Sequence, residues 1–304
     1  FTPLLALAVP VHRQSPDQQP PQGWSIEQAI SIEESDLTMS ENSQPAGRLE
    51  HHVQGHVGYV TFNNPSKFNA VNYDMWCALP VAMKALSDDP EVRLIVLQGA
   101  GDKAFVSGAD ISQFNTHRSG DDSAHYSEAT QAGYAAVLDC TKPTLAKIRG
   151  ICMGGGLGLA LNCDVRMAAS DGKFRMPAGR LGLGYAFDGV KRFTEIVGTA
   201  NTADLFFSAR IFGAEEALRI GLLKQVVAVD EFDAVVSAYA QMVCENAPLT
   251  LAAAKRSLLE LRKNAEDRDL QGVKAMVDAC FTSEDYKEGR KAFTEKRTPQ
   301  FQGR

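Results

Sequence analysis

Residues 148–164 read IRGICMGGGLGLALNCD and join an apolar strand, expected over residues 144–148, to a helix that starts with glycine. Gly154, Gly155 and Gly156 have no side chains that would keep a ligand away from the backbone. The first N–H groups of a helix have no partner within it and lie at the positive end of its dipole. The stretch therefore predicts a site for an anion, or for a carbonyl oxygen that becomes an oxyanion during a reaction. Close packing of the helix on the strand is the alternative explanation of these glycines.

A second loop with small residues, residues 99–111, follows a strand expected over residues 94–97. Ser107, Gly108 and Ala109 leave another backbone N–H free to face a ligand. Two such donors that converge on one oxygen form an oxyanion hole, which is worth about 3–4 kcal/mol per donor. The second loop therefore favours ligand binding as the role of the glycine triplet.

Four segments taken together resemble the crotonase (enoyl-CoA hydratase/isomerase) superfamily. They are NPSKFNA at residues 64–70, SGAD at 107–110, GGG at 154–156 and FTEKR at 293–297, and the resemblance extends from residue 50 or so to the end. It implies an α/β crotonase-like fold with a ββα spiral core and a C-terminal helical trimerisation region. The alternation of expected strands and helices independently indicates an α/β core.

Three regions are expected along the chain. Residues 1–48 are rich in Pro, Gln and Ser without a sustained period, which predicts a disordered or dispensable N-terminal extension. Residues 49–230 would form the core with the coenzyme A and oxyanion loops. Residues 231–304 carry apolar residues at helical spacing and would form the helical oligomerisation region.

Individual elements are expected from hydrophobic period and turn residues. The expected strands are residues 57–62, 94–97, 144–148, 164–168 and 173–176, and the expected helices in the first half are residues 72–86 and 124–138. After Asp188 the pattern is almost entirely helical.

The resemblance implies an acyl-CoA thioester as ligand, with coenzyme A carried by the substrate and no separate cofactor. The N–H groups of Ser107 and Gly155 would then hold the thioester carbonyl and stabilise an enolate. The residues that would lie along coenzyme A are Lys67, Phe68, Ala70, Ala109, Asp110 and Ile111, with Phe293 and Lys296 reaching it from a neighbouring subunit of a homotrimer or hexamer.

The resemblance also implies two glutamates in a hydratase of this superfamily. One belongs two residues after the last glycine of the triplet, where this chain has Gly158, and the other follows Pro177, where it has Ala178. Neither Gly nor Ala can move a proton. The type of reaction is therefore left open by the sequence.

Two polar residues near the expected pocket, Tyr185 and Asp188, are the candidates for proton transfer or substrate orientation. The methylmalonyl-CoA decarboxylase branch has a similar Leu-Gly-x-x-Tyr run, but it has a histidine where this chain has Ala109. Asp188 could instead be the N-cap of a helix that starts at Gly189. Three functions are considered: a hydratase/isomerase-type enzyme, a decarboxylase of malonyl-type esters, and an acyl-CoA binder without catalysis.

The composition of the chain restricts which partners and which cellular compartment are expected. The 304 residues have a net charge of −6 and no block of Lys or Arg, which argues against nucleic acid. The apolar run at residues 4–9 is too short to span a membrane. Six scattered cysteines predict free thiols in a reducing, cytoplasmic compartment, and Met39 resembles a bacterial start. His51, His52 and His56 lack an acidic or Cys partner, so no metal site is expected.

Overall fold

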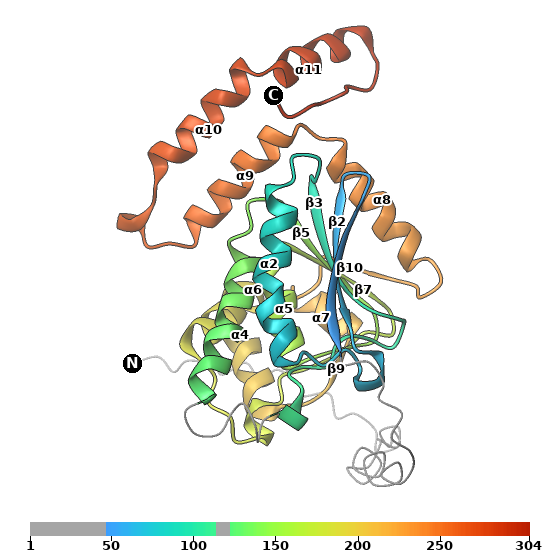
Figure 1. Ribbon diagram of the computed structural model, residues 1–304, viewed down its shortest axis with the longest axis vertical. Coiled ribbons are helices and arrows are strands. Elements are labelled where there is room, and N and C mark those ends of the chain that lie inside the picture. Colours follow the sequence, from blue (N-terminus) through green and yellow to red (C-terminus); the bar gives the residue numbers. More distant parts are fainter. Residues whose placement is uncertain (1–46, 114–121) are drawn as a thin grey trace, which may run out of the picture. The chain divides into compact units, whose positions relative to one another are not determined.

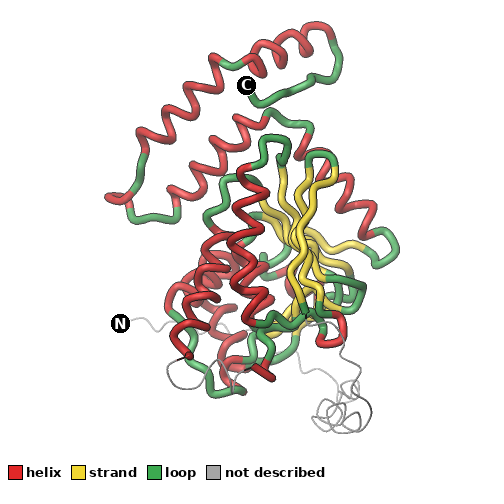
Figure 2. The backbone as a smooth tube through the Cα atoms, in the orientation of Figure 1, coloured by secondary structure: helices red, strands yellow, loops and turns green. Residues whose placement is uncertain are grey.

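A six-stranded sheet forms the centre of the computed structural model, which describes residues 47–113 and 122–304 (Figures 1 and 2). Its strands follow the order β1 (Arg48–Gln54), β2 (Val57–Asn63), β3 (Leu94–Gly99), β5 (Thr144–Ile148), β7 (Val165–Ala169) and β10 (Gln225–Val227). β1 is antiparallel to β2, and every other pair in this sheet is parallel. The expected extension lies outside the described residues up to residue 46, and Arg48 already belongs to β1.

A second sheet has four strands. It follows the order β4 (Ala104–Val106), β6 (Ile151–Met153), β8 (Lys173–Arg175) and β9 (Phe212–Gly213). The chain passes from the first sheet to the second after β3, after β5 and after β7, which is the expected ββα spiral. Between β5 and β6, Gly150 has a φ of 59°, and a Cβ atom there would lie 2.0 Å from the carbonyl oxygen of Lys103. Only glycine fits this turn.

Helices cover both faces of the six-stranded sheet, because side chains alternate along each strand. In β3, Ile95 and Leu97 join the core that packs against α2 (Tyr73–Asp88), α4 (Asp122–Leu138) and α5 (Gly155–Asn162). Leu94 and Val96 join the core beneath α8 (Phe232–Cys244). Figure 1 shows α2 and α8 on opposite sides of the sheet.

Two helices next to the glycine loops start in different ways. Asn72 caps α2, since its side chain accepts a hydrogen bond of 2.8 Å from the N–H of Met75. α5 has no side-chain cap and starts directly on glycine. A Cβ atom at Gly156 would lie 2.1 Å from the Val106 carbonyl oxygen, so this glycine serves the packing of α5 on β4. The packing explanation therefore holds for Gly156.

The remaining helices follow Tyr185. They are α6 (Phe187–Ser208), α7 (Ala214–Arg219), α9 (Pro248–Leu261), α10 (Leu270–Thr282) and α11 (Glu284–Glu295). Short 3₁₀ turns lie elsewhere along the chain, at Pro65–Lys67, Ile111–Gln113, Ala178–Arg180 and Ala265–Asp267. Each element expected from the sequence is present within a few residues. Five strands were not predicted from the sequence: β1, β4, β6, β9 and β10. β9 and β10 interrupt the stretch expected to be helical, and they pair with strands distant in the chain. No helix within the described ranges is both long and apolar enough to cross a bilayer.

Candidate active site

The loop of residues 107–110 is fastened to the residues that precede α2. The N–H of Val71 donates to Gly108, and the N–H of Asp110 donates to Val71, at 2.8 and 2.9 Å. The N–H of Ser107 donates to the carbonyl of Phe68 at 3.0 Å. The expectation that the Ser107 N–H faces the ligand is therefore wrong, because Phe68 already accepts its hydrogen bond.

Ala109 provides the free N–H of this loop. Its neighbours on both sides use their backbone groups to bind Val71, whereas no acceptor for the N–H of Ala109 or of Gly155 lies among the described residues. The two groups are close together, since a Cβ atom added at Gly155 would lie 3.5 Å from the Ala109 nitrogen. This arrangement can hold one oxygen atom between two N–H donors.

The corner before α2 carries the residues expected along coenzyme A. The ammonium of Lys67 lies 2.9 Å from the carboxylate of Asp110 and 2.9 Å from the hydroxyl of Ser112. Burial alone would raise the pKa of Asp110, but the hydrogen bonds from Ser112 and Lys67 outweigh it and hold that pKa below its usual value. Asp110 is thus a buried anion that positions the half-exposed Lys67 beside the loop.

The other residues expected along coenzyme A differ in exposure. Phe68 and Ile111 are exposed, Ala109 is half-buried, and Ala70 is buried. Phe68 has a φ of 51°, in the left-handed region, at the end of the 3₁₀ turn. This conformation places an apolar ring at the surface next to the oxygen that accepts from Ser107.

Tyr185 and Asp188 lie at the start of α6. Burial raises the pKa of Tyr185 to about 12, and its ring packs against Phe193 and Phe206 with centroids 6.3 and 5.1 Å away. Tyr185 therefore stays protonated at neutral pH and cannot act as a base there. The helix begins at Phe187, so the alternative of Asp188 as an N-cap is wrong. Asp188 lies in the first turn of α6, exposed to solvent.

Two aromatic residues next to Gly155 were not predicted from the sequence to be part of the site. The hydroxyl of Tyr134, on α4, donates to the carbonyl of Gly155 at 3.1 Å. Trp76, on α2, is buried, and its ring contacts Tyr134 edge to face. The sequence predicted both helices but not the side chains that they direct at the glycine loop. The sequence feature that could have indicated such a neighbour is Gly158, because a residue without a side chain in a packed core leaves space that another side chain fills.

Comparisons with known proteins agree with this geometry. A family model described as enoyl-CoA hydratase/isomerase matches residues 52–304. The chain belongs to the enoyl-CoA hydratase/isomerase family.

Several relatives are similar over most of their length. Crotonyl-CoA hydratase of Syntrophomonas wolfei is 34% identical over 245 residues, which cover 81% of this chain and 94% of that protein. The peroxisomal Delta(3,5)-Delta(2,4)-dienoyl-CoA isomerase of Arabidopsis thaliana is 32% identical over 257 residues, which cover 81% and 92%. The crystal structure of an enoyl-CoA hydratase/carnithine racemase from Magnetospirillum magneticum has a TM-score of 0.79 at 33% identity and covers 84% of this chain and 96% of that one. The predicted crotonase-like α/β fold is confirmed.

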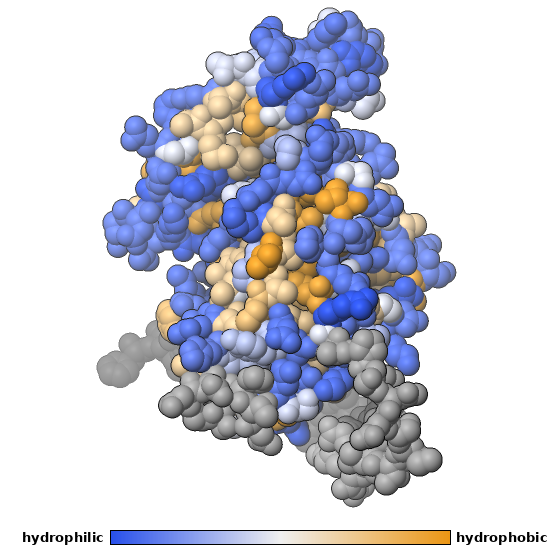
Figure 3. Space-filling model, viewed as in Figure 1, coloured by the Kyte–Doolittle hydropathy of each residue, from blue (hydrophilic) through white to orange (hydrophobic). Residues whose placement is uncertain are grey.

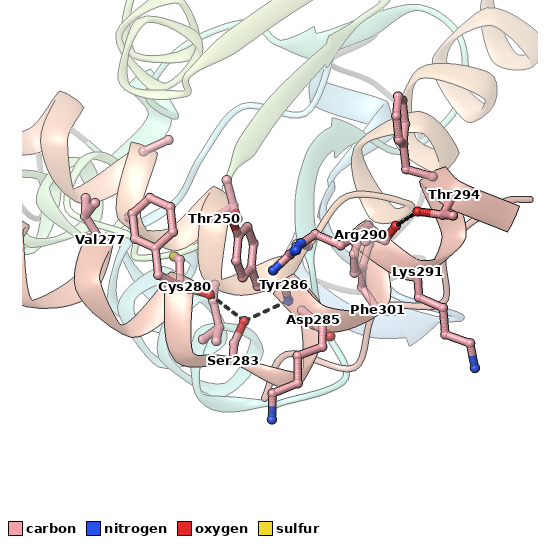
Figure 4. A pocket seen from close by; sticks show the side chains of 18 of the residues that line it. Thr250, Val277, Cys280, Ser283, Asp285, Tyr286, Arg290, Lys291, Thr294 and Phe301 are labelled. Atoms are coloured by element: carbon pink, nitrogen blue, oxygen red, sulfur yellow. Dashed lines mark hydrogen bonds between the residues drawn. The ribbon is translucent and has the colours of Figure 1, made fainter. Parts of the chain in front are cut away.

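The tail residues lie apart from the glycine loops within one chain. Phe293 and Lys296 are exposed at the end of α11, where Lys296 has a φ of 53°. Phe293 borders a groove of about 1020 Å³ between α9, α10 and α11 (Figure 4). The described residues that line the groove include Val277, Tyr286 and Phe301 but none from the two glycine loops. Among the described residues, the groove beside Phe293 and the two glycine loops therefore share no lining residue.

Proposed function

We propose that this protein processes an acyl-CoA thioester whose carbonyl oxygen accepts hydrogen bonds from the N–H groups of Ala109 and Gly155. The observation that carries the proposal is the pair of adjacent N–H groups with no acceptor in the described part of the chain. Removal of a proton from the α-carbon turns the thioester carbonyl into an enolate. Two donors aimed at its oxygen stabilise that charge by about 3–4 kcal/mol each.

Coenzyme A is proposed to lie along the corner formed by Lys67, Phe68 and Ala70 and along the 109–111 segment. Lys67 is held in place by Asp110 yet keeps half of its side chain exposed, so its ammonium can reach a phosphate. The exposed rings and side chains of Phe68 and Ile111 offer apolar surface beside it. No separate cofactor is needed, because the reacting carbonyl and coenzyme A arrive as one molecule.

The proposed reaction is a rearrangement through the enolate with little addition of water. At the positions where the family's hydratases would carry glutamates, this chain has Gly158 and Ala178, and both are buried. A shift of a double bond needs only that a proton leaves the α-carbon and a proton is added at the γ-carbon, so no atom is gained. Hydration requires a base that activates water, and positioned acid–base groups contribute about 10²–10⁴-fold.

The test compares two esters in one assay. We expect the protein to convert a β,γ-unsaturated acyl-CoA to its conjugated isomer, and to exchange the α-protons of a saturated acyl-CoA in deuterated water, measured by proton NMR. Hydration of crotonyl-CoA should be slower than isomerisation by about 10²-fold or more, because the site lacks the positioned acid–base groups that activate water. The same assay on Tyr185→Phe and Asp188→Asn tests whether Tyr185 acts as a proton donor and whether Asp188 takes part in proton transfer. Hydration faster than isomerisation would contradict the proposal.

The two alternative functions have less support. The relatives described above are named as hydratases and an isomerase. A malonyl-type decarboxylase and a binder without catalysis are therefore not favoured. Tyr185, the one residue that suggested decarboxylation, packs among Phe193 and Phe206.

A trimer or hexamer is proposed from the C-terminal helices. Figure 3 shows apolar atoms exposed on the viewed face among a mostly hydrophilic surface. The exposed apolar residues on α9, α10 and α11 include Leu258, Leu261, Leu270, Val277, Phe281 and Phe293. Surfaces of this kind are more often interfaces than free surface.

Light scattering at micromolar concentration should give the mass of three or six chains. Phe281→Asp places a charge in the apolar surface of α10 and should shift the mass towards a single chain. A wild-type protein that scatters as a monomer would contradict the assembly.

A further inference from the structure

The side chain of Tyr134 occupies the space beside Gly158. A Cβ atom added at Gly158 would lie 2.7 Å from the Tyr134 hydroxyl oxygen and 2.9 Å from its Cζ atom. Carbon atoms that are not bonded do not approach this closely in well-packed proteins. A side chain at position 158 and the ring of Tyr134 in its present place therefore exclude each other.

Two of the contacts of Tyr134 help to fix it at this place. Its hydroxyl donates to the Gly155 carbonyl at 3.1 Å, and its ring meets the indole of Trp76 with centroids 5.2 Å apart and planes at 70°. Trp76 is itself fully buried between α2 and α4, and a Cβ atom on Gly133 would lie 2.8 Å from its Cε3 atom. The ring of Tyr134 cannot move aside without disturbing this packing.

The Tyr134 hydroxyl also borders the proposed oxyanion hole. The position of a Cβ atom on Gly155 lies 3.4 Å from this hydroxyl, 3.5 Å from the Ala109 nitrogen and 3.5 Å from Cζ2 of Trp76. The hydroxyl and the oxyanion donors thus face one small space. The rings of Trp76 and Tyr134 thus give this space an aromatic wall, to which the Tyr134 hydroxyl adds a polar group. The indole N–H of Trp76 is buried with no acceptor among the described residues.

We infer that Tyr134 determines the reaction specificity of this site, by taking the volume that a carboxylate at position 158 would need and presenting a hydroxyl there instead. The inference rests on the proposed acyl-CoA function. A neutral phenol is a far weaker base than a carboxylate, so it does not activate water for addition to a double bond. The substrates are then acyl-CoA thioesters that react through the enolate without net addition of water.

The experiment compares four proteins: wild type, Gly158→Glu, Tyr134→Ala and the double variant. Each is tested for acetyl-CoA binding by calorimetry, for hydration of crotonyl-CoA, for isomerisation of a β,γ-unsaturated acyl-CoA, and for melting temperature. Tyr134→Phe keeps the ring and removes only the hydroxyl. Gly213→Glu, placed where a Cβ atom meets nothing within 4 Å, is the matched control in both backgrounds.

We expect Gly158→Glu alone to lower the melting temperature without faster hydration. In the Tyr134→Ala background, Gly158→Glu should lower the melting temperature by less than it does in wild type. Only the double variant should raise the ratio of the hydration rate to the isomerisation rate, by about 10-fold or more. A structural defect would lower both reactions and leave this ratio unchanged. With Tyr134→Phe, the glutamate should still be excluded, because the Cζ atom remains.

Two results would overturn the inference. One is a Gly158→Glu variant that hydrates as fast as the double variant, and the other is a ratio in the double variant within two-fold of wild type. Gly158→Asp is made in parallel, so that a shorter carboxylate gives the answer if the double glutamate variant does not fold. A wild-type protein that neither binds acetyl-CoA nor converts either ester would instead refute the proposed function, and the inference with it.

Discussion

Gly155→Ala should lower the turnover of an acyl-CoA ester by about 10²–10³-fold, which is the loss of rate typical when one oxyanion donor is removed. The fold should stay intact. The new methyl group would lie 3.4 to 3.5 Å from Tyr134, Ala109 and Trp76, which is ordinary van der Waals contact. It would nevertheless fill the space that both N–H donors face, so the thioester carbonyl could not approach them. Turnover and melting temperature are measured on the same preparation.

The neighbouring glycine gives the opposite expectation. Gly156→Ala would place a methyl group 2.1 Å from the Val106 carbonyl oxygen and force α5 away from β4, so the protein should melt at a lower temperature. Gly213→Ala, in open space, should change neither property. If Gly155→Ala retained turnover within a few-fold of wild type, the pair of donors at Ala109 and Gly155 would be wrong.

Lys255→Met should destabilise the protein by about 3–5 kcal/mol, because it leaves a carboxylate without its buried partner. The side chain of Lys255 is 3% exposed, and its ammonium lies 2.7 Å from each carboxylate oxygen of Asp164. One of these oxygens also accepts from the N–H and the hydroxyl of Thr144, at the start of β5. The pair thus joins α9 to the strands of the central sheet, and its loss weakens the attachment of the C-terminal helices.

Urea unfolding at one fixed protein concentration measures this effect, since assembly would change the apparent stability with concentration. Lys84→Met is the matched control, because Lys84 and Asp88 form an exposed pair on one helix face that is worth about 0.3–0.5 kcal/mol. The double variant Lys255→Met with Asp164→Asn should recover part of the loss. A cost for Lys255→Met no larger than that of the control would contradict the role of the buried pair.

Much of the site's backbone follows from residues close together in the chain. The apolar strand at residues 144–148, the glycine triplet and the helix after it lie where the sequence places them. Glycine and hydrophobic period act locally, because a strand, a turn and a helix start need only their nearest neighbours. The C-terminal helices were predictable for the same reason.

The chemistry next to that backbone could not be predicted in this way. Which N–H is free depends on Phe68, which accepts from Ser107 and leaves Ala109 as the donor beside Gly155. Asp188 looked like a helix cap, but α6 begins one residue before it, so its carboxylate lies within the first turn. The first outcome depends on which N–H a distant carbonyl accepts from, and the second depends on the residue at which the helix begins. The spacing of residues in the sequence decides neither.

By itself, the sequence determined an α/β core, the two loops that carry the candidate oxyanion hole, and membership of a family whose motifs it contains in order. Only the tertiary structure decided that Tyr134 stands where a side chain at position 158 would be, and that Lys255 reaches Asp164 across 91 residues of chain. The physical reason is that a strand or a glycine turn is set by local backbone geometry. The occupant of a shared volume is set by long-range packing, in which residues far apart in the sequence compete for the same space.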